Sequence, residues 1–428
     1  MVAPGAMRHC CLIGLASWQP KKTPQLIPWT NKHNATTADL NWSCPWDALL
    51  RIHAPCRKVA TSGQKSSRAC FLCSRPRQSR DPETPSALDV INVPICQPSL
   101  LSLFRIIDPF VANMSSEPKV NTCYEAKTGT WQYIIADPTT NEAVIIDSVL
   151  DFDAASSKIT TESADELLKL VERHKYTISY ILETHVHADH LTASAYLQDQ
   201  LTKKSGKRPS ICIGKRIGQV QSRFVERYLV DSTEMQGAFD HTFEDEEIFS
   251  IGKLQAQVMH LPGHTPDHIG YVIGSNVFTG DSIFNPDVGS ARCDFPGGSA
   301  TVLFDSMSKL LSLPADYHLY TGHDYPPDSR QNNNESASKA VPYTTVGEQR
   351  RENKHVKEGT IKENFVKWRS ERDAGLAEPK IIHQALQFNI RGGRLPKADC
   401  EGYRFFRVPL KVPQAFLTWG ITPETMYY

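Results

Sequence analysis

The pattern of hydrophobic and polar positions becomes regular only after the first quarter of this 428-residue chain. Two short apolar runs, residues 131–136 and 143–146, flank the polar stretch 137–141, whose proline and asparagine favour a turn, so they predict a β-hairpin. Residues 1–113 keep neither a period of 2 nor one of 3.6, and they are rich in Pro, Ser, Arg and Cys. That composition predicts a disordered or irregular N-terminal extension.

Helical and strand-like stretches alternate after the hairpin. Apolar residues recur at helical spacing behind Ser163-x-x-Glu166, a capping-box pattern, which predicts an amphipathic helix over 164–174. The apolar, β-rich stretch 177–183 is typical of a buried strand. Later strands are expected at 210–213, 254–259, 276–281 and near 319–323, and helices near 192–202, 216–228 and 345–356, the last opened by a second capping box. This alternation predicts an α/β layer architecture.

Composition divides the chain near the same point. Residues 1–113 hold 13 Lys and Arg against 6 Asp and Glu, the remainder holds 34 against 41, and seven of the eleven cysteines lie in the first part. The sparse cysteines of the second part indicate a reducing compartment, mitochondrial or cytoplasmic, rather than a disulfide framework. The chain has no run of 18 apolar residues, so no membrane span is predicted. The mixed charges of the 345–358 region predict a solvated face rather than a nucleic-acid partner.

Two interpretations of residues 1–113 stay open. The segment is either sequence that precedes a true start at Met114 or an organellar presequence, for which a basic, acid-poor beginning is typical. Its Cys70-x-x-Cys73 pair has no second pair at zinc-finger spacing and is a weak zinc candidate.

The candidate chemistry gathers where four predicted strands end. The stretch 184–190, Thr-His-Val-His-Ala-Asp-His, follows the strand 177–183 directly and supplies three imidazoles and one carboxylate. A rigid strand end presents ligands at little ordering cost, and packing alone has no reason to produce such a set. The sequence therefore predicts a metal site. Its candidate ligands are His185, His187, Asp189, His190, His264, Asp281 and His323, while His260 and His268 stay open between ligand, outer contact and surface residue.

The order of the motifs THVHADH, PGHTPDH, FTGD and GHDY resembles the metallo-β-lactamase superfamily over residues from about 120 to 325. The stretches ARCDFPGG at 291–298 and HDY at 323–325 are similar to its persulfide dioxygenase (sulfur dioxygenase) branch, and NIRGGRLP at 389–396 is similar to the C-terminal element of bacterial members. The resemblance implies an αβ/βα four-layer sandwich with the metal at one edge. We expect the catalytic domain at 114–330 and a C-terminal extension, packed on that domain, at 331–428; the length of this tail departs from compact family members.

The same resemblance implies an enzyme that oxidises glutathione persulfide with O2 to sulfite and glutathione. By motif, His185, His264 and Asp281 correspond to the ligands of one Fe(II) per chain, a set that leaves three coordination positions open. Arg292 corresponds to an arginine near the substrate, where a guanidinium suits a glutathione carboxylate. The phenol of Tyr325 corresponds to a hydrogen-bond donor for a bound sulfur or oxygen species.

A hydrolytic alternative comes from the remaining ligands. His187, Asp189, His190 and His323 correspond to the residues that complete a second metal site in hydrolase relatives. Two zinc ions, or a mixed zinc and iron pair, bridged by Asp281 would favour a thioester hydrolase of the glyoxalase II type. The metal identity and count, the substrate thiol and a homodimer through the long tail stay open, and Cys293 is expected to be structural.

Overall fold

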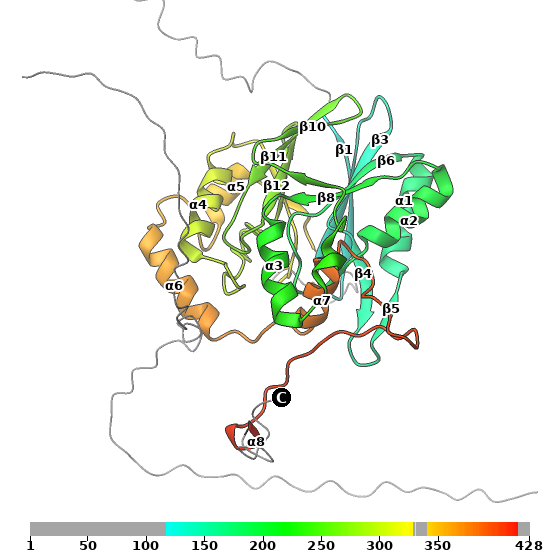
Figure 1. The fold of residues 1–428 in the computed structure, drawn as a ribbon. Coiled ribbons are helices and arrows are strands. Elements are labelled where there is room, and N and C mark those ends of the chain that lie inside the picture. The colour runs from blue at the N-terminus through cyan, green and yellow to red at the C-terminus, as the bar shows by residue number, and fades with distance from the viewer. Residues whose placement is uncertain (1–116, 328–329, 331–339, 418–428) are drawn as a thin grey trace, which may run out of the picture. The chain divides into compact units, whose positions relative to one another are not determined.

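A computed structural model describes residues 117–327, 330 and 340–417. The predicted N-terminal extension and its Cys70-x-x-Cys73 pair lie outside the described residues. Two six-stranded sheets face each other, with helices α4, α5 and α6 on one side and α1 and α2 on the other (Figure 1). This is the α/β four-layer sandwich that the resemblance implied.

The first sheet has the order β1-β2-β3-β6-β8-β9. Its first three strands are antiparallel, and from β3 onward neighbours run parallel. The strands are β1 (Lys119–Glu125), β2 (Thr130–Ala136), β3 (Glu142–Ile146), β6 (Thr177–Leu182), β8 (Ser210–Gly214) and β9 (His241–Phe243). The predicted hairpin 131–146 and the strand 177–183 therefore form its centre.

The second sheet has the order β10-β11-β12-β13-β14-β15, antiparallel except for the β13 and β14 pair. The strands are β10 (Ile248–Ile251), β11 (Leu254–His260), β12 (Ile269–Ile273), β13 (Asn276–Gly280), β14 (His318–Thr321) and β15 (Tyr343–Thr345). Strand β15 comes from the part of the chain after residue 330, so the tail completes a sheet of the sandwich. A small third sheet joins β5 (Lys158–Thr160), β4 (Val149–Asp153) and β7 (Leu191–Thr192).

Alternation along β2 shows how the layers are held together. Tyr133 and Ile135 point into the core between the sheets, where the Tyr133 ring lies 5.1 Å from that of Phe278, while Ile134 and Ala136 face the helices. All of them are buried, because successive side chains of a strand point to opposite faces and both faces are covered here.

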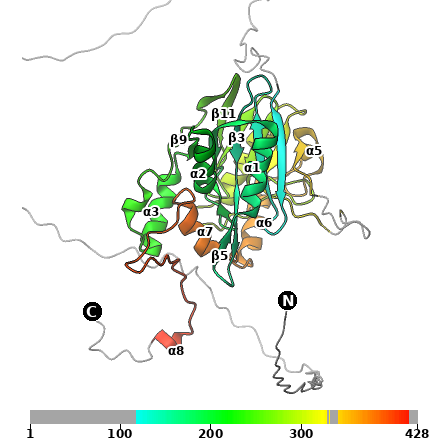
Figure 2. The same ribbon diagram turned by 90° about the vertical axis from the view of Figure 1, so that its right-hand side faces the viewer.

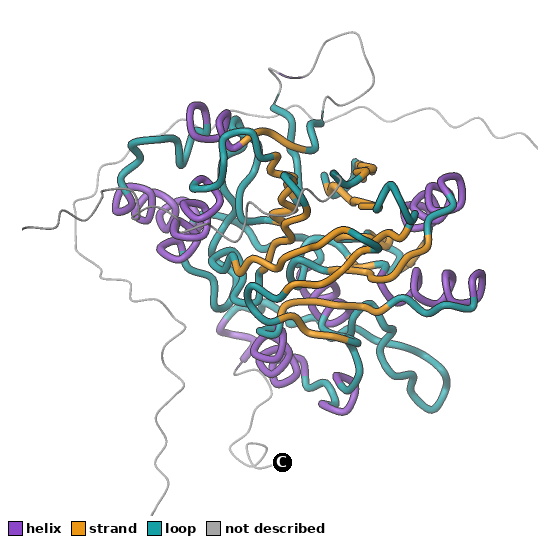
Figure 3. The backbone as a smooth tube through the Cα atoms, turned by 90° about the horizontal axis from the view of Figure 1, so that it is seen from above, coloured by secondary structure: helices purple, strands orange, loops and turns teal. Residues whose placement is uncertain are grey.

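The helices cover the two outer faces in separate groups. Figure 2 looks onto the face that carries α1 and α2, and Figure 3, seen from above, shows the strands in the middle with helices at the periphery. Apolar residues of α1, α2 and α7 pack on the first sheet, and those of α4, α5 and α6 pack on the second. The helices are α1 (Glu162–His174), α2 (Ser194–Ser205), α3 (Ile217–Tyr228), α4 (Ala300–Leu311), α5 (Val346–Glu352), α6 (Lys362–Ala374), α7 (Ile382–Asn389) and α8 (Gln414–Leu417), with the 3-10 turn η2 (Ser232–Met235).

The two predicted capping boxes had different outcomes. Thr345 and Glu348 form the box at α5, with each side chain bonded to the other residue's backbone, although the helix ends at Glu352 rather than near 356. The box at Ser163 is wrong: α1 already begins at Glu162, and the Ser163 hydroxyl donates to Asp151 instead. Among the described residues, no helix is long and apolar enough to cross a membrane.

Candidate metal centre

Four strand ends bring the predicted ligands to one edge of the sandwich. In the second sheet β11, β13 and β14 run in the same direction, so the residues that follow them, His264, Asp281 and His323, lie at the same edge. From the first sheet, β6 leads into residues 183–192, here called the ligand loop, which carries four further candidates. The ends of β6 in the first sheet and of β11, β13 and β14 in the second sheet therefore bring the candidate ligands together.

One group of ligand atoms comes from three separate segments. Donor atoms of His185, His264 and Asp281 lie within 4.8 Å of one another, and all three residues are buried. His264 Nε2 is 3.7 Å from Asp281 Oδ2, and the rings of His185 and His264 are nearly perpendicular with centroids 5.1 Å apart. Two imidazoles and one carboxylate at this spacing form a set that can hold one ion.

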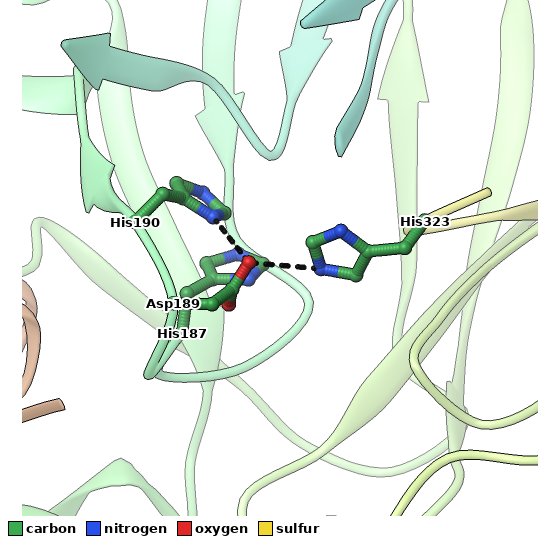
Figure 4. A group of neighbouring side chains, drawn as sticks. All are labelled: His187, Asp189, His190 and His323. Carbon is green, nitrogen blue, oxygen red and sulfur yellow. Dashed lines mark hydrogen bonds and ion pairs between the residues drawn. The ribbon is translucent and has the colours of Figure 1, made fainter. Parts of the chain in front are cut away.

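A second group lies beside the first. It consists of His187, Asp189, His190 and His323 (Figure 4), whose ligand atoms also lie within 4.8 Å of one another. Asp189 Oδ2 is 3.4 Å from both His190 Nδ1 and His323 Nε2. Because Asp281 Oδ2 is 3.5 Å from His323 Nε2, this carboxylate stands between the two groups.

The buried polar atoms of the site fit a metal ion. Most buried polar atoms in proteins have a hydrogen-bond partner. Here His187 Nδ1, His190 Nε2, His323 Nε2 and Asp281 Oδ1 have none within the described part of the chain. Three imidazole nitrogens and a carboxylate oxygen gathered without hydrogen-bond partners are the ligand types of a cation site, so the residues present fit the metal that the motifs imply.

The orientation of His185 is set by Thr184 and Asp147. The Thr184 hydroxyl lies 2.8 Å from Asp147 Oδ2 and 2.9 Å from His185 Nδ1. A carboxylate only accepts, so the hydroxyl donates to Asp147 and accepts from His185 Nδ1. That arrangement leaves the Nε2 lone pair of His185 free for a metal.

His264 and His187 are held in the same manner. His264 Nδ1 lies 2.7 Å from the carbonyl oxygen of Arg292, and since a carbonyl only accepts, Nε2 of this ring faces the site as an acceptor. His187 Nε2 lies 3.1 Å from Asp147 Oδ1 and 3.3 Å from Glu183 Oε2, which leaves Nδ1 for the site. Outer contacts thus orient three of the candidate ligands.

Electrostatics follow from this burial. Desolvation, followed by the neighbouring histidines, lowers the pKa of His185 well below its usual value, so its imidazole is neutral, as a metal ligand requires. Burial alone would lower the pKa of His187, but Asp147 and Glu183 raise it well above the usual value. Burial also opposes ionisation of Asp189, yet His323 and His190 lower its pKa, so the carboxylate is charged.

The two histidines left open by the sequence lie outside the ligand groups. His268 Nε2 accepts the backbone N–H of Asp281 at 3.0 Å, and its ring stacks on His185 with centroids 4.6 Å apart. It therefore supports two ligands without being one. His260 faces Asp245, with Nδ1 3.6 Å from Oδ2, and is only partly buried.

Arg292 and Tyr325 lie next to the ligands in different ways. The Arg292 guanidinium is paired with Asp294 and donates to the Ala377 carbonyl at 3.0 Å, while its own carbonyl holds His264. The ring of Tyr325 stacks on His323 with centroids 5.6 Å apart. Desolvation and the carboxylates of Asp189 and Asp281 raise the pKa of its phenol, which keeps the proton needed for donation. Their substrate roles stay predictions.

Cys293 is buried, and its backbone N–H donates to Asp373. Desolvation raises the pKa of its thiol to about 12, so the reactive thiolate is disfavoured. This agrees with the structural role expected for it.

Several supporting residues were not identified from the sequence as functional. Asp147, Asp267 and Asn389 are buried and contact the ligand loop, the second through a 3.0 Å bond from Val186 N to its Oδ2, and Glu183 is the buried first residue of that loop. Asp147 and Glu183 had a local signal, since each ends an apolar strand in a carboxylate. Asp267 and Asn389 lie within the motifs at 262–268 and 389–396, but their bonds to the ligand loop are known only once the chain is folded.

Comparisons with known proteins bear on the family of this chain. The family model of the metallo-beta-lactamase superfamily matches residues 127–323. The chain is 40% identical over 300 residues to Glyoxylase B2 of Dictyostelium discoideum, covering 69% of this chain and 98% of that protein. It is 42% identical over 303 residues to the Beta-lactamase hydrolase-like protein of Agrobacterium fabrum, covering 71% of this chain and 67% of that protein, so a third of that relative has no counterpart in the match.

Other matches bear on the chemistry. The crystal structure of ETHE1 from Myxococcus xanthus has a TM-score of 0.50 at 28% identity and covers 64% of this chain and 100% of its own. The mitochondrial persulfide dioxygenase ETHE1 of Bos taurus is 28% identical over 63% of this chain and 87% of that protein, and a hydroxyacylglutathione hydrolase of Bradyrhizobium is 29% identical over 50% and 68%. With a four-layer fold, clustered ligands and relatives of this similarity, the chain belongs to the metallo-β-lactamase superfamily.

Proposed function

We propose that this protein oxidises glutathione persulfide with O2 to sulfite and glutathione, with one Fe(II) held by His185, His264 and Asp281. The observation that carries the proposal is the composition of the first ligand group. It contains two imidazoles and one carboxylate, and His187 is not part of it: among the described residues His187 is grouped with Asp189, His190 and His323 and also with Asp147 and Glu183. An Fe(II) bound by such a set would offer three open positions, enough for a persulfide sulfur and O2 side by side.

The residues of this chain contribute orientation and proton placement. Thr184 and the Arg292 carbonyl keep the Nε2 atoms of His185 and His264 aimed at the site. Tyr325, stacked beside the second group, keeps its proton and can donate to a bound sulfur or oxygen atom. A glutathione carboxylate at Arg292 would have to share its guanidinium with Asp294, so we expect a supporting role for this residue rather than a dominant one.

Two kinds of similarity support the proposal, namely short motifs and a match to a named relative. The stretches at 291–298 and 323–325 resemble the persulfide dioxygenase branch, and the match to the bovine persulfide dioxygenase extends over 63% of this chain, against 50% for the hydroxyacylglutathione hydrolase. We also propose a reducing compartment, mitochondrial or cytoplasmic, because the four described cysteines are all unpaired.

A binuclear thioester hydrolase of the glyoxalase II type is the second candidate. Its specific support is the intact second group and the position of the Asp281 carboxylate, with one oxygen 3.7 Å from His264 Nε2 and 3.5 Å from His323 Nε2. Relatives named as hydrolase-like and as a glyoxylase B2 are also more similar in sequence than the persulfide dioxygenase.

Two measurements on the whole protein separate these functions. Protein purified without oxygen should contain close to one iron per chain with little zinc, and it should consume O2 when given glutathione persulfide. Two tightly held metals per chain with no preference for iron would favour the hydrolase. Thiol release from lactoylglutathione, with no O2 uptake from glutathione persulfide, would refute the dioxygenase assignment.

A further inference from the structure

A side chain from the C-terminal part of the chain is bonded to the ligand loop. Asn389, at the end of α7, donates from Nδ2 to the carbonyl oxygens of His187 at 2.9 Å and His190 at 2.8 Å. Its Oδ1 accepts the backbone N–H of Thr192 at 2.9 Å. The residue is 3% exposed and lies about two hundred positions from its partners in sequence, so only folding brings them together.

A carboxamide is suited to this position because it offers two donors and one acceptor on a short, planar group. The loop carbonyls of His187 and His190 belong to no strand, and a buried backbone carbonyl without a donor is unfavourable. One amide group thus fixes the backbone of two candidate ligands and the residue that ends the loop.

The end of α7 is itself anchored, so it can hold the loop in place. Arg391 Nε lies 2.9 Å from Glu234 Oε2, and Gln221 Nε2 donates to the Ile390 carbonyl at 2.9 Å. Gly393 has a φ of 80°, and a Cβ there would lie 3.0 Å from the Thr192 carbonyl oxygen, so the segment packs closely on the end of the loop. Residues 382–393 are therefore a rigid support for the ligand loop.

We propose that Asn389 is a positioning residue of the metal centre, through which the C-terminal segment controls metal affinity and coordination geometry. The inference goes beyond the proposed function, because it concerns the placement of His187 and His190 and applies equally to a one-iron oxygenase and a two-metal hydrolase. It also gives the tail a defined role at the site, although all ligands precede residue 324.

The test uses Co(II) as the probe, since its visible absorption bands report coordination geometry without any catalysis. Asn389→Leu keeps the number and branching of the side-chain heavy atoms and removes all three hydrogen bonds. We expect Co(II) to bind roughly 10- to 100-fold more weakly, as for other outer contacts of metal ligands, with altered visible bands.

The matched control lies two residues away in the same helix. Gln387 is 2% exposed, and the described bonds of its side chain go to backbone groups, namely the His383 carbonyl and both the carbonyl and the N–H of Arg407, none of which belongs to the ligand loop. Gln387→Met should lower the thermal unfolding temperature as Asn389→Leu does, yet leave the Co(II) affinity and spectrum as in the parent. This separates a positioning role from a general loss of stability.

Two further measurements keep the proposal open to refutation if Asn389→Leu does not fold. Asn389→Asp keeps an acceptor for the Thr192 N–H but places a carboxylate oxygen against the carbonyls of His187 and His190. Because these oxygens repel each other, the ligand loop should shift and the Co(II) affinity and visible bands should change. If residues 382–393 of the parent protein strengthen metal binding by holding the ligand loop, thermodynamic linkage requires that bound metal in turn stabilise the contact between these residues and the loop. Co(II) should then slow amide exchange in residues 382–393 more than in α1.

Co(II) affinity and visible spectrum unchanged in the Asn389 variants would overturn the inference, whatever happens to their stability. So would amide exchange in residues 382–393 that does not respond to Co(II). A changed spectrum in Gln387→Met equal to that in Asn389→Leu would also overturn it, because the effect would then belong to helix packing. None of these outcomes depends on whether the protein consumes O2.

Discussion

Replacing Thr184 by Val isolates the contact that orients His185. Thr184 is fully buried, and its hydroxyl bonds to Asp147 Oδ2 at 2.8 Å and to His185 Nδ1 at 2.9 Å. Valine has nearly the same shape but no hydroxyl. The variant therefore leaves a buried Nδ1–H of His185 without an acceptor and takes one donor from a buried carboxylate.

The expected magnitudes follow from these two losses. A hydrogen bond to a charged group contributes about 1.5 to 3 kcal/mol, and an unsatisfied buried donor costs about 1 to 3 kcal/mol, so metal-free Thr184→Val should be destabilised by roughly 2.5 to 6 kcal/mol. With the imidazole free to rotate or change tautomer, metal affinity should fall about 10- to 100-fold, equivalent to roughly 1.4 to 2.7 kcal/mol.

The assay compares Thr184→Val with Thr279→Val. The Thr279 hydroxyl is also fully buried but donates only to the carbonyls of Tyr320 at 3.0 Å and Gly280 at 3.2 Å. Stability is measured by urea unfolding of the metal-free proteins, and metal affinity by competition with a chelator. The control should lose about 1 kcal/mol and keep its metal affinity. If Thr184→Val binds metal within about twofold of the parent, the hydroxyl does not orient His185 and the reasoning fails.

Three further predictions test the site and the chain around it. His264→Ala should lose both iron and activity, whereas His323→Ala should keep most of its iron and lose rate by about 10- to 100-fold; equal metal loss in both, measured by metal analysis, would favour the two-metal site. Burial opposes ionisation of Asp137, but hydrogen bonds from Lys253 N–H and from Thr139 and Thr140 lower its pKa from 3.8 to about 2. The ionised carboxylate therefore stabilises the fold above the unfolded pKa, and this stabilisation is lost as the pH falls through about 2. Asp137→Asn should therefore be less stable than the parent in urea unfolding at neutral pH and equal to it near pH 2, and a constant difference would contradict the assignment. A chain that begins at Met114 should keep its activity, because all predicted ligands lie downstream; insoluble protein would show that the preceding residues are needed for folding.

The sequence determined the elements and the ligand inventory, because both depend on local patterns. Between residues 130 and 260 the strands β2, β3, β6, β8 and β11 and the helices α1, α2 and α3 were predicted within a few residues, since apolar periodicity and turn residues act over short distances. The strands β4, β5, β7, β9 and β10 were not predicted. The motifs at 184–190, 264, 281 and 323 predicted seven ligands, and the structure places all seven in two adjacent groups. Helix ends were less predictable: the box at Ser163 has the right residues, but Asp151 competes for its hydroxyl.

Only the tertiary structure decided how those ligands are grouped and held. Spacing along the chain puts His185 and His187 on the same loop, yet they belong to different groups, because His187 is turned by Asp147 and Glu183. The contact from Asn389 to the ligand loop joins two motifs about two hundred positions apart, and nothing in either motif shows that they meet. Local sequence specifies which metal-ligand side chains follow a strand end. The directions of these side chains depend on hydrogen bonds to distant segments, and those bonds exist only when both sheets and α7 are packed together.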